Sequence, residues 1–560
     1  MNDAASGTAV IIERASQGWR PYVLLILLCL GLYLPGIAAL PVLDRDEARF
    51  AQATRQMLES RDFLRIRFQN EARNKKPAGI YWLQAASVAA LSDAESTTIW
   101  PYRLPSLIGA TAAALLAFAL GRALVGNAAA LLGAALLAST LDLTVEAHLA
   151  KTDAVLLAAV VAAQGALGII YRDARRGEAP ARWGLALLFW TAQGLALLIK
   201  GPLAPVLSLL TAAALSIADC DMRWLRGLRP LWGGPLMLAI AAPWFIAITA
   251  ATSGAFIGEA VGHDFFGKLV GAQEAHGAPP GYYLALLPVT FWPGSLFLGA
   301  AFAWGWRERS APAVRFLVAW IFPFWAALEL VPTKLPHYIL PAYPALALLA
   351  GSALVGVAAA SARRRWLDAI VTALWVVVSL VLAAALALLP LRFGYGVAAA
   401  GVVAGAIILL FGKRLVFAAW RAPVPGLAVR AVLLALLVFA PAFQFVAPRL
   451  DALWLSRGAA EIVARYRPPR DAPVVAVGYS EPSLVFLLGT ATRFVSPDQA
   501  ADYLTSARGA SALVSDRDEA AFRAALETRG WEARPVDRVS GLDYSNGKAM
   551  TLTLYTGAPR

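Results

Sequence analysis

The stretch Pro41–Leu83 concentrates charge in an otherwise apolar chain, with the sequence PVLDRDEARFAQATRQMLESRDFLRIRFQNEARNKKPAGIYWL. It follows a hydrophobic run, opens with carboxylates and closes with a basic patch beside two aromatic residues. The carboxylates are Asp44, Asp46 and Glu47, the bases are Arg73, Lys75 and Lys76, and the aromatic residues are Tyr81 and Trp82. Ionisable groups at this density next to a hydrophobic run predict a polar site at a membrane surface.

The composition places most of the chain in a membrane. Of its 560 residues, 59% are hydrophobic and 15% are charged, whereas soluble domains average about 45–50% apolar and about 25% charged residues. Several runs reach the roughly 20 residues that a helix needs to cross a bilayer. The net charge of +13 comes from short basic clusters between these runs, which is typical of cytoplasmic loops and argues against nucleic acid as a partner.

We expect a polytopic α-helical membrane protein with about thirteen transmembrane helices. They cover residues 22–40, 103–121, 127–146, 154–171, 183–200, 203–218, 235–252, 284–304, 313–331, 338–359, 367–389, 396–411 and 429–447. The run Ala78–Leu91 has about 14 residues and contains Gln84, so it is too short to cross. It is expected to lie in the membrane interface, like the amphipathic segment Asp46–Leu58.

Loop charges indicate which side each loop faces. With Ala78–Leu91 left out of the crossings, the arginine-rich loops fall on the same side as the N-terminus, which is therefore cytoplasmic. The outer side receives the first loop 41–102, the long loop 253–283 and the segment 448–560. Residues 1–447 would then form the membrane domain.

Residues 448–560 have the composition of a soluble domain. Strands are expected at 473–478, 493–495, 512–515 and 549–555, and helices at 482–488, 497–507 and 517–528. Alternating strands and helices predict a small α/β domain, which lies outside the membrane.

Two acidic clusters on the outer side are candidates for chemistry. One of the acids Asp44, Asp46 and Glu47 would suffice to cap the helix that follows, so three of them favour a functional site. The second cluster lies between two spans and holds Glu146, Lys151 and Asp153. There a helix cap and a lysine that reaches the headgroups explain the residues equally well, and both interpretations stay open.

Bases from separate regions also reach the outer side. A single lysine at the end of a span usually extends toward the headgroups, but several sets on one side would form a pocket for a lipid phosphate. The expected phosphate-binding residues are Arg49, Lys75, Lys76, Lys200, Lys334, His337 and Tyr338, with Arg73 beside them.

The long outer loop contains two histidines that could bind a metal. His263 and His276, with Glu71 from the first loop as a third ligand, offer nitrogen and oxygen donors suited to a divalent ion such as zinc. The reaction itself is expected to require no cofactor.

Several motifs together resemble a known family. They are Asp46-Glu47-Ala48-Arg49, Asn74-Lys75-Lys76-Pro77, Tyr81-Trp82-Leu83-Gln84, Lys200-Gly201-Pro202 and Thr333-Lys334-Leu335-Pro336-His337-Tyr338. In this order they resemble the protein mannosyltransferase-like glycosyltransferases of GT-C fold, over roughly residues 20–450. Within that superfamily the chain is most similar to the bacterial lipid A aminoarabinose transferases, although many relatives read Asn-Lys-Pro-Pro where this chain has Asn-Lys-Lys-Pro.

The resemblance implies an enzyme of the bacterial inner membrane with its active site and C-terminal domain in the periplasm. It would move 4-amino-4-deoxy-L-arabinose from undecaprenyl phosphate to a lipid A phosphate, by a single displacement that inverts the anomeric carbon. The resemblance places Asp46 or Glu47 at the reacting centre, with Asp153 as a second acid and Asp44 as a further candidate. Tyr81, Glu146 and Tyr343 are expected to bind other parts of the substrates.

Two alternatives remain at this stage. The same fold could use a polyprenyl-phosphate hexose as donor and a protein, hopanoid or glycan as acceptor, because sugar selectivity depends on the shape of the pocket. A transporter or lipid flippase is the alternative of another class. Transporters, however, commonly place charged groups near the middle of the bilayer and show paired halves, and neither feature is evident here.

Overall fold

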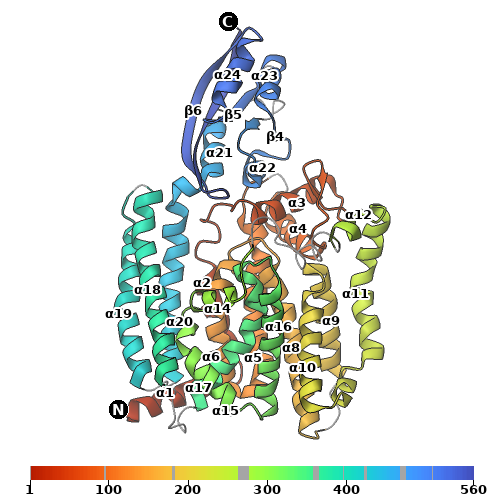
Figure 1. Cartoon of the computed structure of the whole chain (residues 1–560), viewed down its shortest axis with the longest axis vertical. Coiled ribbons are helices and arrows are strands. Elements are labelled where there is room, and N and C mark those ends of the chain that lie inside the picture. The colour runs from red at the N-terminus through yellow and green to blue at the C-terminus, as the bar shows by residue number, and fades with distance from the viewer. Residues whose placement is uncertain are drawn as a thin grey trace.

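The apolar runs of the sequence form long helices that assemble into one bundle, and a small sheet domain stands on one end of it (Figure 1). The computed structural model describes residues 2–93, 96–178, 183–260, 262, 277–356, 365–394, 396–421, 425–466, 474–507 and 509–559. Figure 1 shows the N-terminus at the opposite end of the bundle from the C-terminus.

The helices of the membrane domain lie close to the predicted positions, except for two helices over 2–15 and 255–257 that were not predicted. They are α1 (Asn2–Ala15), α2 (Arg20–Tyr33), α5 (Trp100–Val125), α6 (Asn127–Ala138), α7 (Leu141–Ala147), α8 (Asp153–Arg175), α9 (Trp183–Lys200), α10 (Leu203–Asp219), α11 (Pro230–Ala251), α12 (Ala255–Ile257), α14 (Tyr282–Thr290), α15 (Leu298–Arg307), α16 (Pro312–Leu330), α17 (Tyr343–Gly356), α18 (Arg365–Phe393), α19 (Ala399–Arg421) and α20 (Pro425–Pro441). Short 3₁₀ segments include η1 (Arg223–Leu228) and η4 (Pro336–Ala342).

Within the described residues, nine helices are long and apolar enough to cross a membrane, or up to twelve if each of three bent pairs counts as one span. The bent pairs are α1 with α2, α6 with α7, and α14 with η3 (Gly294–Phe297) and α15. The shorter apolar helix α10 corresponds to the remaining predicted span. The prediction of a polytopic helical membrane domain is therefore confirmed.

The first loop forms a layer between the bundle and the sheet domain. It contains helix α3 (Asp46–Ser60), the two-stranded hairpin β1 (Arg67–Phe68) and β2 (Glu71–Ala72), and helix α4 (Gly79–Leu91). Helix α4 has only 13 residues, and Figure 1 shows α3 and α4 at the end of the bundle. Both predicted helices of the first loop are thus present.

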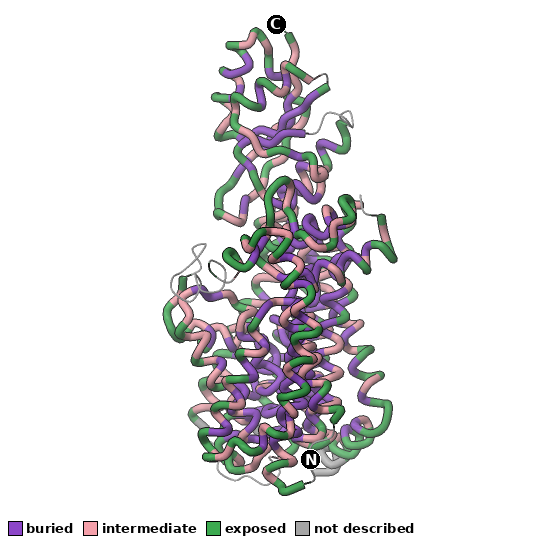
Figure 2. The backbone as a smooth tube through the Cα atoms, turned by 90° about the vertical axis from the view of Figure 1, so that its right-hand side faces the viewer, coloured by how far each residue is buried: buried purple, intermediate pink, exposed green. Residues whose placement is uncertain are grey.

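Small residues let the central helices approach closely. Helices α6 and α17 meet at Gly351, where an added Cβ would lie 2.2 Å from the carbonyl oxygen of Ala129. Helices α5 and α8 meet at Gly109, where a Cβ would lie 2.7 Å from the Cα of Val155. Such contacts are the usual source of helix association in lipid, where apolar burial gives little driving force. Figure 2 shows buried residues concentrated along the middle of the bundle.

The C-terminal domain is a five-stranded mixed sheet with strand order β4-β3-β5-β7-β6. The strands are β3 (Val475–Val477), β4 (Arg493–Phe494), β5 (Ser511–Ser515), β6 (Trp531–Asp543) and β7 (Lys548–Pro559), and the helices are α21 (Leu455–Tyr466), α22 (Pro482–Leu488), α23 (Pro497–Ser506) and α24 (Glu519–Glu527). Strand β3 pairs in parallel with β4 and β5, while β7 runs antiparallel to β5 and β6. The predicted small α/β domain is confirmed, but sequence reasoning missed β6.

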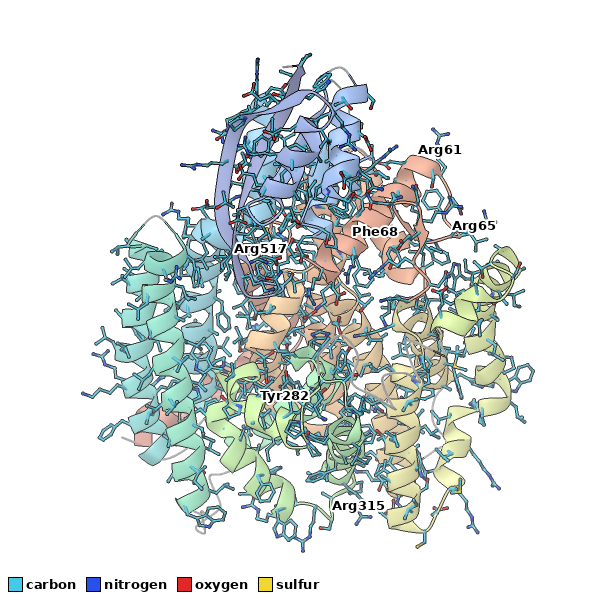
Figure 3. The ribbon with its side chains drawn as sticks, turned by 45° about the horizontal axis from the view of Figure 1, so that its top comes forward. Arg61, Arg65, Phe68, Tyr282, Arg315 and Arg517 are labelled. Carbon is cyan, nitrogen blue, oxygen red and sulfur yellow. The ribbon has the colours of Figure 1, made fainter. Side chains whose placement is uncertain are left out.

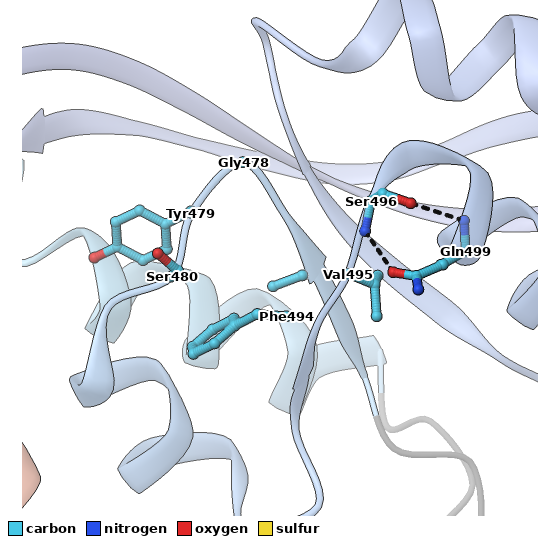
Figure 4. A pocket seen from close by; sticks show the side chains of 8 residues that line it. Gly478, Tyr479, Ser480, Phe494, Val495, Ser496 and Gln499 are labelled. Carbon is cyan, nitrogen blue, oxygen red and sulfur yellow. Dashed lines mark hydrogen bonds between the residues drawn. The ribbon is translucent and has the colours of Figure 1, made fainter. Parts of the chain in front are cut away.

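A cavity of about 360 Å³ opens at the carboxyl end of β3 (Figure 4). It lies where the parallel strands diverge, which is the usual place for ligands in open α/β sheets. Two of its polar residues, Ser496 and Gln499, already form the capping box of α23, and the Tyr479 hydroxyl lies 2.7 Å from Ser456 Oγ. These satisfied groups leave little to recognise a ligand.

The close approach of α6 and α17 gives a prediction for stability. Gly351→Ala should lower the free energy of unfolding by about 1–3 kcal/mol, because the added methyl group collides with backbone. Gly234→Ala is the matched control, since an added Cβ there meets nothing within 4 Å. Thermal unfolding of the purified protein in detergent measures both, and equal melting temperatures for the two variants would contradict the packing argument.

Candidate active site

Glu47 forms a buried, bidentate ion pair with Arg103. Its carboxylate oxygens accept hydrogen bonds from Arg103 Nε at 2.8 Å and Nη2 at 2.9 Å. They also accept the backbone N–H groups of Leu43 and Ala150, at 2.8 and 2.9 Å. The remaining guanidinium hydrogens go to the carbonyl oxygens of Ile37, Leu40 and Pro41. This pair joins the start of the first loop to α5 and to the turn before α8.

Asp46 is exposed and has no hydrogen-bond or ion-pair partner among the described residues. It is the first residue of α3. The surrounding protein disfavours its charged form, but the positive charges of Lys151, Arg73 and Arg49 outweigh this and hold the pKa of Asp46 below its ordinary value. Its carboxylate is therefore ionised and available to a ligand.

Four charged groups and a histidine converge beside Asp46, from helix ends that meet at one end of the bundle. Lys151 Nζ donates to Glu146 Oε1 at 2.9 Å, and Lys200 Nζ donates to Asp153 Oδ1. His337 lies between the two pairs, 3.6 Å from Glu146 Oε1 and 3.8 Å from Asp153 Oδ1. We call these five residues the ion-pair cluster.

The backbone of the cluster explains how distant residues meet. Asp153 is the first residue of α8, Lys200 is the last residue of α9, and His337 lies in η4. Gly201, with φ of 78°, ends α9 and lets the chain turn into α10. The Lys200 ammonium also lies 5.4 Å from the centre of the Tyr338 ring, within the range of a cation–π contact.

The basic end of the first loop also lies near Asp46. Arg73 stacks over Phe50, with its guanidinium carbon 5.3 Å from the ring centre, and its Nε donates to the Tyr81 hydroxyl at 3.3 Å. Lys75 is exposed and Lys76 is half-buried. Asp46 thus lies among bases contributed by α3, the hairpin region and the turn before α8.

Three of the predicted residues contact groups outside this cluster. Lys334 is buried and donates to the carbonyl oxygens of Val331 and Ala278, at 2.7 and 2.9 Å. Tyr343 is buried, and its hydroxyl contacts that of Thr290. Asp44 contacts the C-terminal domain, where its Oδ1 accepts the Ser483 hydroxyl. The predicted roles of these three residues in substrate binding or catalysis stay predictions.

Comparisons with known proteins extend the resemblance beyond the first loop. The family model of dolichyl-phosphate-mannose-protein mannosyltransferases matches residues 75–246. An undecaprenyl phosphate-alpha-4-amino-4-deoxy-L-arabinose arabinosyl transferase from Pseudomonas paraeruginosa is 31% identical over 346 residues, which cover 59% of this chain and 59% of that protein. The transferase of the same name from Pectobacterium carotovorum is 30% identical over 62% of this chain and 61% of its own length. The matched part is thus about three fifths of each relative.

Solved structures agree over nearly the whole chain. The crystal structure of ArnT from Cupriavidus metallidurans bound to undecaprenyl phosphate has a TM-score of 0.75 and 19% identity, covering 95% of this chain and 97% of that one. Its apo state has a TM-score of 0.73 with the same coverage. The chain therefore has the GT-C fold that the resemblance of the sequence motifs implied.

The predicted metal ligands are only partly within the described residues. His263 and His276 lie outside them, and Glu71 is exposed in the hairpin strand β2. In the part of the chain that the structure describes, no three histidine, cysteine or acidic side chains come together as a metal site would require. The zinc site stays a prediction from sequence.

Two buried residues near the candidate site were not predicted from the sequence. Arg103 begins a predicted span, and a lone basic residue inside an apolar run was the signal that could have found it. Asp142 lies in α7, buried, with Oδ2 lacking a hydrogen bond within the described residues. Glu146 Oε2 lacks one as well, so both carboxylates have capacity for further donors.

The Glu47–Arg103 pair gives the second prediction. Arg103→Met leaves a buried carboxylate without its cation, which should cost about 3–5 kcal/mol of stability. Arg122→Met on the same helix is the control, because Arg122 is exposed and surface changes usually stay within about 0.5 kcal/mol. Thermal unfolding in detergent measures the difference. A melting temperature of Arg103→Met equal to that of the control would exclude a structural role for the pair.

Proposed function

We propose that the protein is a membrane glycosyltransferase that moves 4-amino-4-deoxy-L-arabinose from undecaprenyl phosphate to a phosphate of lipid A. The transfer takes place on the periplasmic face of the bacterial inner membrane, with the N-terminus in the cytoplasm. The names of the aminoarabinose transferases and the whole-chain likeness to ArnT bound to undecaprenyl phosphate support this assignment. Arginine-rich loops at the opposite end of the bundle support the orientation.

The observation that carries the proposal is the contrast between Asp46 and its surroundings. Glu47 forms an ion pair with Arg103, and Glu146 and Asp153 each form an ion pair with a lysine. Asp46 is the exposed, ionised acid among them, with several bases around it. A site of this kind can bind a cationic sugar and an anionic phosphate side by side.

The reaction would be a single displacement at the anomeric carbon. A lipid A phosphate oxygen forms the new bond as the bond to the undecaprenyl phosphate oxygen breaks, and the electron pair leaves with undecaprenyl phosphate. The acceptor phosphate is already ionised, so no base has to remove a proton. Positioning and electrostatics would then supply most of the rate.

Charge develops in two places during this displacement. Positive charge grows on the sugar, where the Asp46 carboxylate would stabilise it and hold the amino group of the sugar. Negative charge grows on the departing phosphate, where Arg49, Arg73 and the lysines of the first loop would stabilise it. A group that interacts with charge present only in the transition state lowers the activation barrier more than it strengthens substrate binding.

A transporter fits these observations less well. Transporter sites lie near the middle of the bilayer, between broken helices. The ion-pair cluster instead lies at helix ends, with Asp153 opening α8 and Lys200 closing α9. It also lies next to α3, in the layer between the bundle and the sheet domain, which a lipid headgroup would reach without crossing the bundle.

Asp46→Asn is the third prediction. It should reduce aminoarabinose on lipid A by roughly a hundredfold or more, because it removes the charge opposite the developing cation. Asp93→Asn is the matched control in the same loop, since Asp93 is exposed and lies after α4. Mass spectrometry of lipid A from cells with the wild-type chain, each variant or no copy measures the effect.

The outcomes separate the parts of the proposal. Unchanged aminoarabinose in cells without the protein would overturn the assignment of substrate. Wild-type levels with Asp46→Asn would overturn the role of Asp46 and leave the substrate assignment in place. Another hexose or pentose accumulating on its polyprenyl carrier in the deletion strain would point to a different donor.

A further inference from the structure

The C-terminal domain makes direct contact with the residues that precede Asp46. The turn between β6 and β7 contributes two bonds: the Asp44 backbone N–H donates to the Tyr544 hydroxyl at 2.7 Å, and Arg45 Nη2 donates to the Ser545 carbonyl at 2.9 Å. Ser483, in α22, donates its hydroxyl to Asp44 Oδ1. Three groups from two elements of the domain thus hold two consecutive residues of the first loop.

The backbone between these contacts is in an unfavourable conformation. Arg45 has φ of 62° and ψ of −108°, a region that residues with a side chain rarely adopt and that glycine adopts without strain. Such conformations persist only where the surrounding structure imposes them. Arg45 immediately precedes Asp46, so its torsion angles decide where the Asp46 carboxylate points.

The turn that holds Arg45 is itself rigid. Asp543 accepts the Ser545 N–H at 3.1 Å and the Asn546 side-chain amide at 2.7 Å, and its carbonyl accepts the Gly547 N–H at 2.8 Å. Gly547 has φ of 74°, which closes the turn without strain. A rigid turn can transmit a fixed geometry to the segment that it contacts.

Apolar packing anchors the domain beside the same segment. Phe486 of α22 is fully buried, in a cluster that includes Val42, Ala48 and Ala150, and lies 5.4 Å from the ring centre of Tyr102. Its carbonyl oxygen accepts Arg55 Nη1 at 3.0 Å. Figure 3 shows Arg61, Arg65 and Phe68 of the first loop at the same end of the bundle as the domain, and Arg315 at the opposite end.

We propose that the C-terminal domain is a positioning element of the active site, which holds Asp44 and Arg45 so that Asp46 faces the bases around it. This rests on the function proposed above, since it concerns the reaction at Asp46. Tyr544, Ser483 and Arg45 are positioning residues, because they act through the backbone of Asp46 and contact no substrate themselves.

The charges at this contact support the proposal. Burial, Glu481 and Asp543 raise the pKa of Asp44 to about 8, so Asp44 is protonated at neutral pH and two acids of the domain can lie beside it. Tyr479 and Tyr544 stay neutral because burial raises the pKa of each. Arg45 and Arg49 are the nearby cations. Their positive charges partly offset the rise in the pKa of Glu481 that burial causes.

Kinetics of the full-length protein in nanodiscs, with a lipid-linked aminopentose as donor, form the first test. Tyr544→Phe and Ser483→Ala should each lower kcat about tenfold and leave KM for the donor within about twofold, because misplacement of a catalytic group affects the reacting geometry. Tyr555→Phe is the matched control, which removes a hydroxyl bound to Glu519 in the same domain. Unchanged kcat in both test variants, or an equal loss in the control, would overturn the proposal.

Arg45 distinguishes backbone geometry from side-chain charge. Arg45→Ala and Arg45→Gly both lose the guanidinium, but glycine accepts the torsion angles of this position. Arg45→Gly should therefore retain several-fold more activity than Arg45→Ala. Equal activity of the two variants would overturn the claim that the imposed conformation matters.

The pH profile adds a readout that a purely structural contact would not change. As the pH rises through about 8, Asp44 ionises beside Glu481 and Asp543, so the stabilisation of the contact is present at lower pH and lost above this value. The kcat of the wild-type chain should fall over this range more steeply than that of Asp44→Asn, which keeps a neutral side chain there. Parallel profiles would contradict the proposal.

Hydrogen–deuterium exchange tests the contact without any substrate. In Tyr544→Phe, amides of residues 43–47 should exchange faster than in the wild-type chain and in Tyr555→Phe, because the Asp44 N–H loses its acceptor. If no aminoarabinose transfer is found but exchange changes as expected, the proposed function fails while the contact stands. Unchanged exchange would overturn the positioning role, whatever sugar the protein transfers.

Discussion

The structure depends on the cost of burying charge in a medium with little water. A buried carboxylate is stable only with a cation and enough hydrogen bonds, and Glu47 has both in Arg103 and two backbone N–H groups. Because Arg103 also binds three carbonyl oxygens of the preceding segment, one ion pair fixes the whole entry to the first loop. The other charged residues of this region lie around the segment before α3, which the ion pair holds in place.

The same rule explains why Asp46 differs from its neighbour. Successive residues at a helix start point in different directions, so Glu47 faces the bundle while Asp46 faces outward. Glu146 and Asp153 are paired with Lys151 and Lys200. The positive charges of Lys151, Arg73 and Arg49 keep Asp46 ionised. The cluster is thus nearly neutral, and the charge available for a ligand lies at its outer edge.

Most of the fold could be predicted from the sequence because hydrophobic length decides where helices cross. The thirteen expected spans and the surface helices followed from this and from loop charge. Strand β6 did not, because it is an edge strand whose residues are largely exposed, so it lacks apolar alternation. For the candidate site, the motifs located the right loop, but nothing in the pattern Asp46-Glu47 says which acid is paired. The partner of Glu47 is 56 residues away, and Lys334 binds backbone although it lies in the same motif as His337.

The role of the C-terminal domain could not be predicted from the sequence, because the residues that meet there are far apart along the chain. Asp44 and Tyr544 are 500 residues apart, and nothing in the motif of the loop or in the sequence of the turn indicates that they meet. The loop has a strained residue that cannot hold its own conformation, and the turn offers it a rigid backbone with acceptors at Tyr544 and Ser545. A soluble domain that buries Phe486 in the membrane domain can hold that conformation only when both parts are folded. In the positioning role proposed above, the candidate active site therefore requires the docked domain as well as the helices.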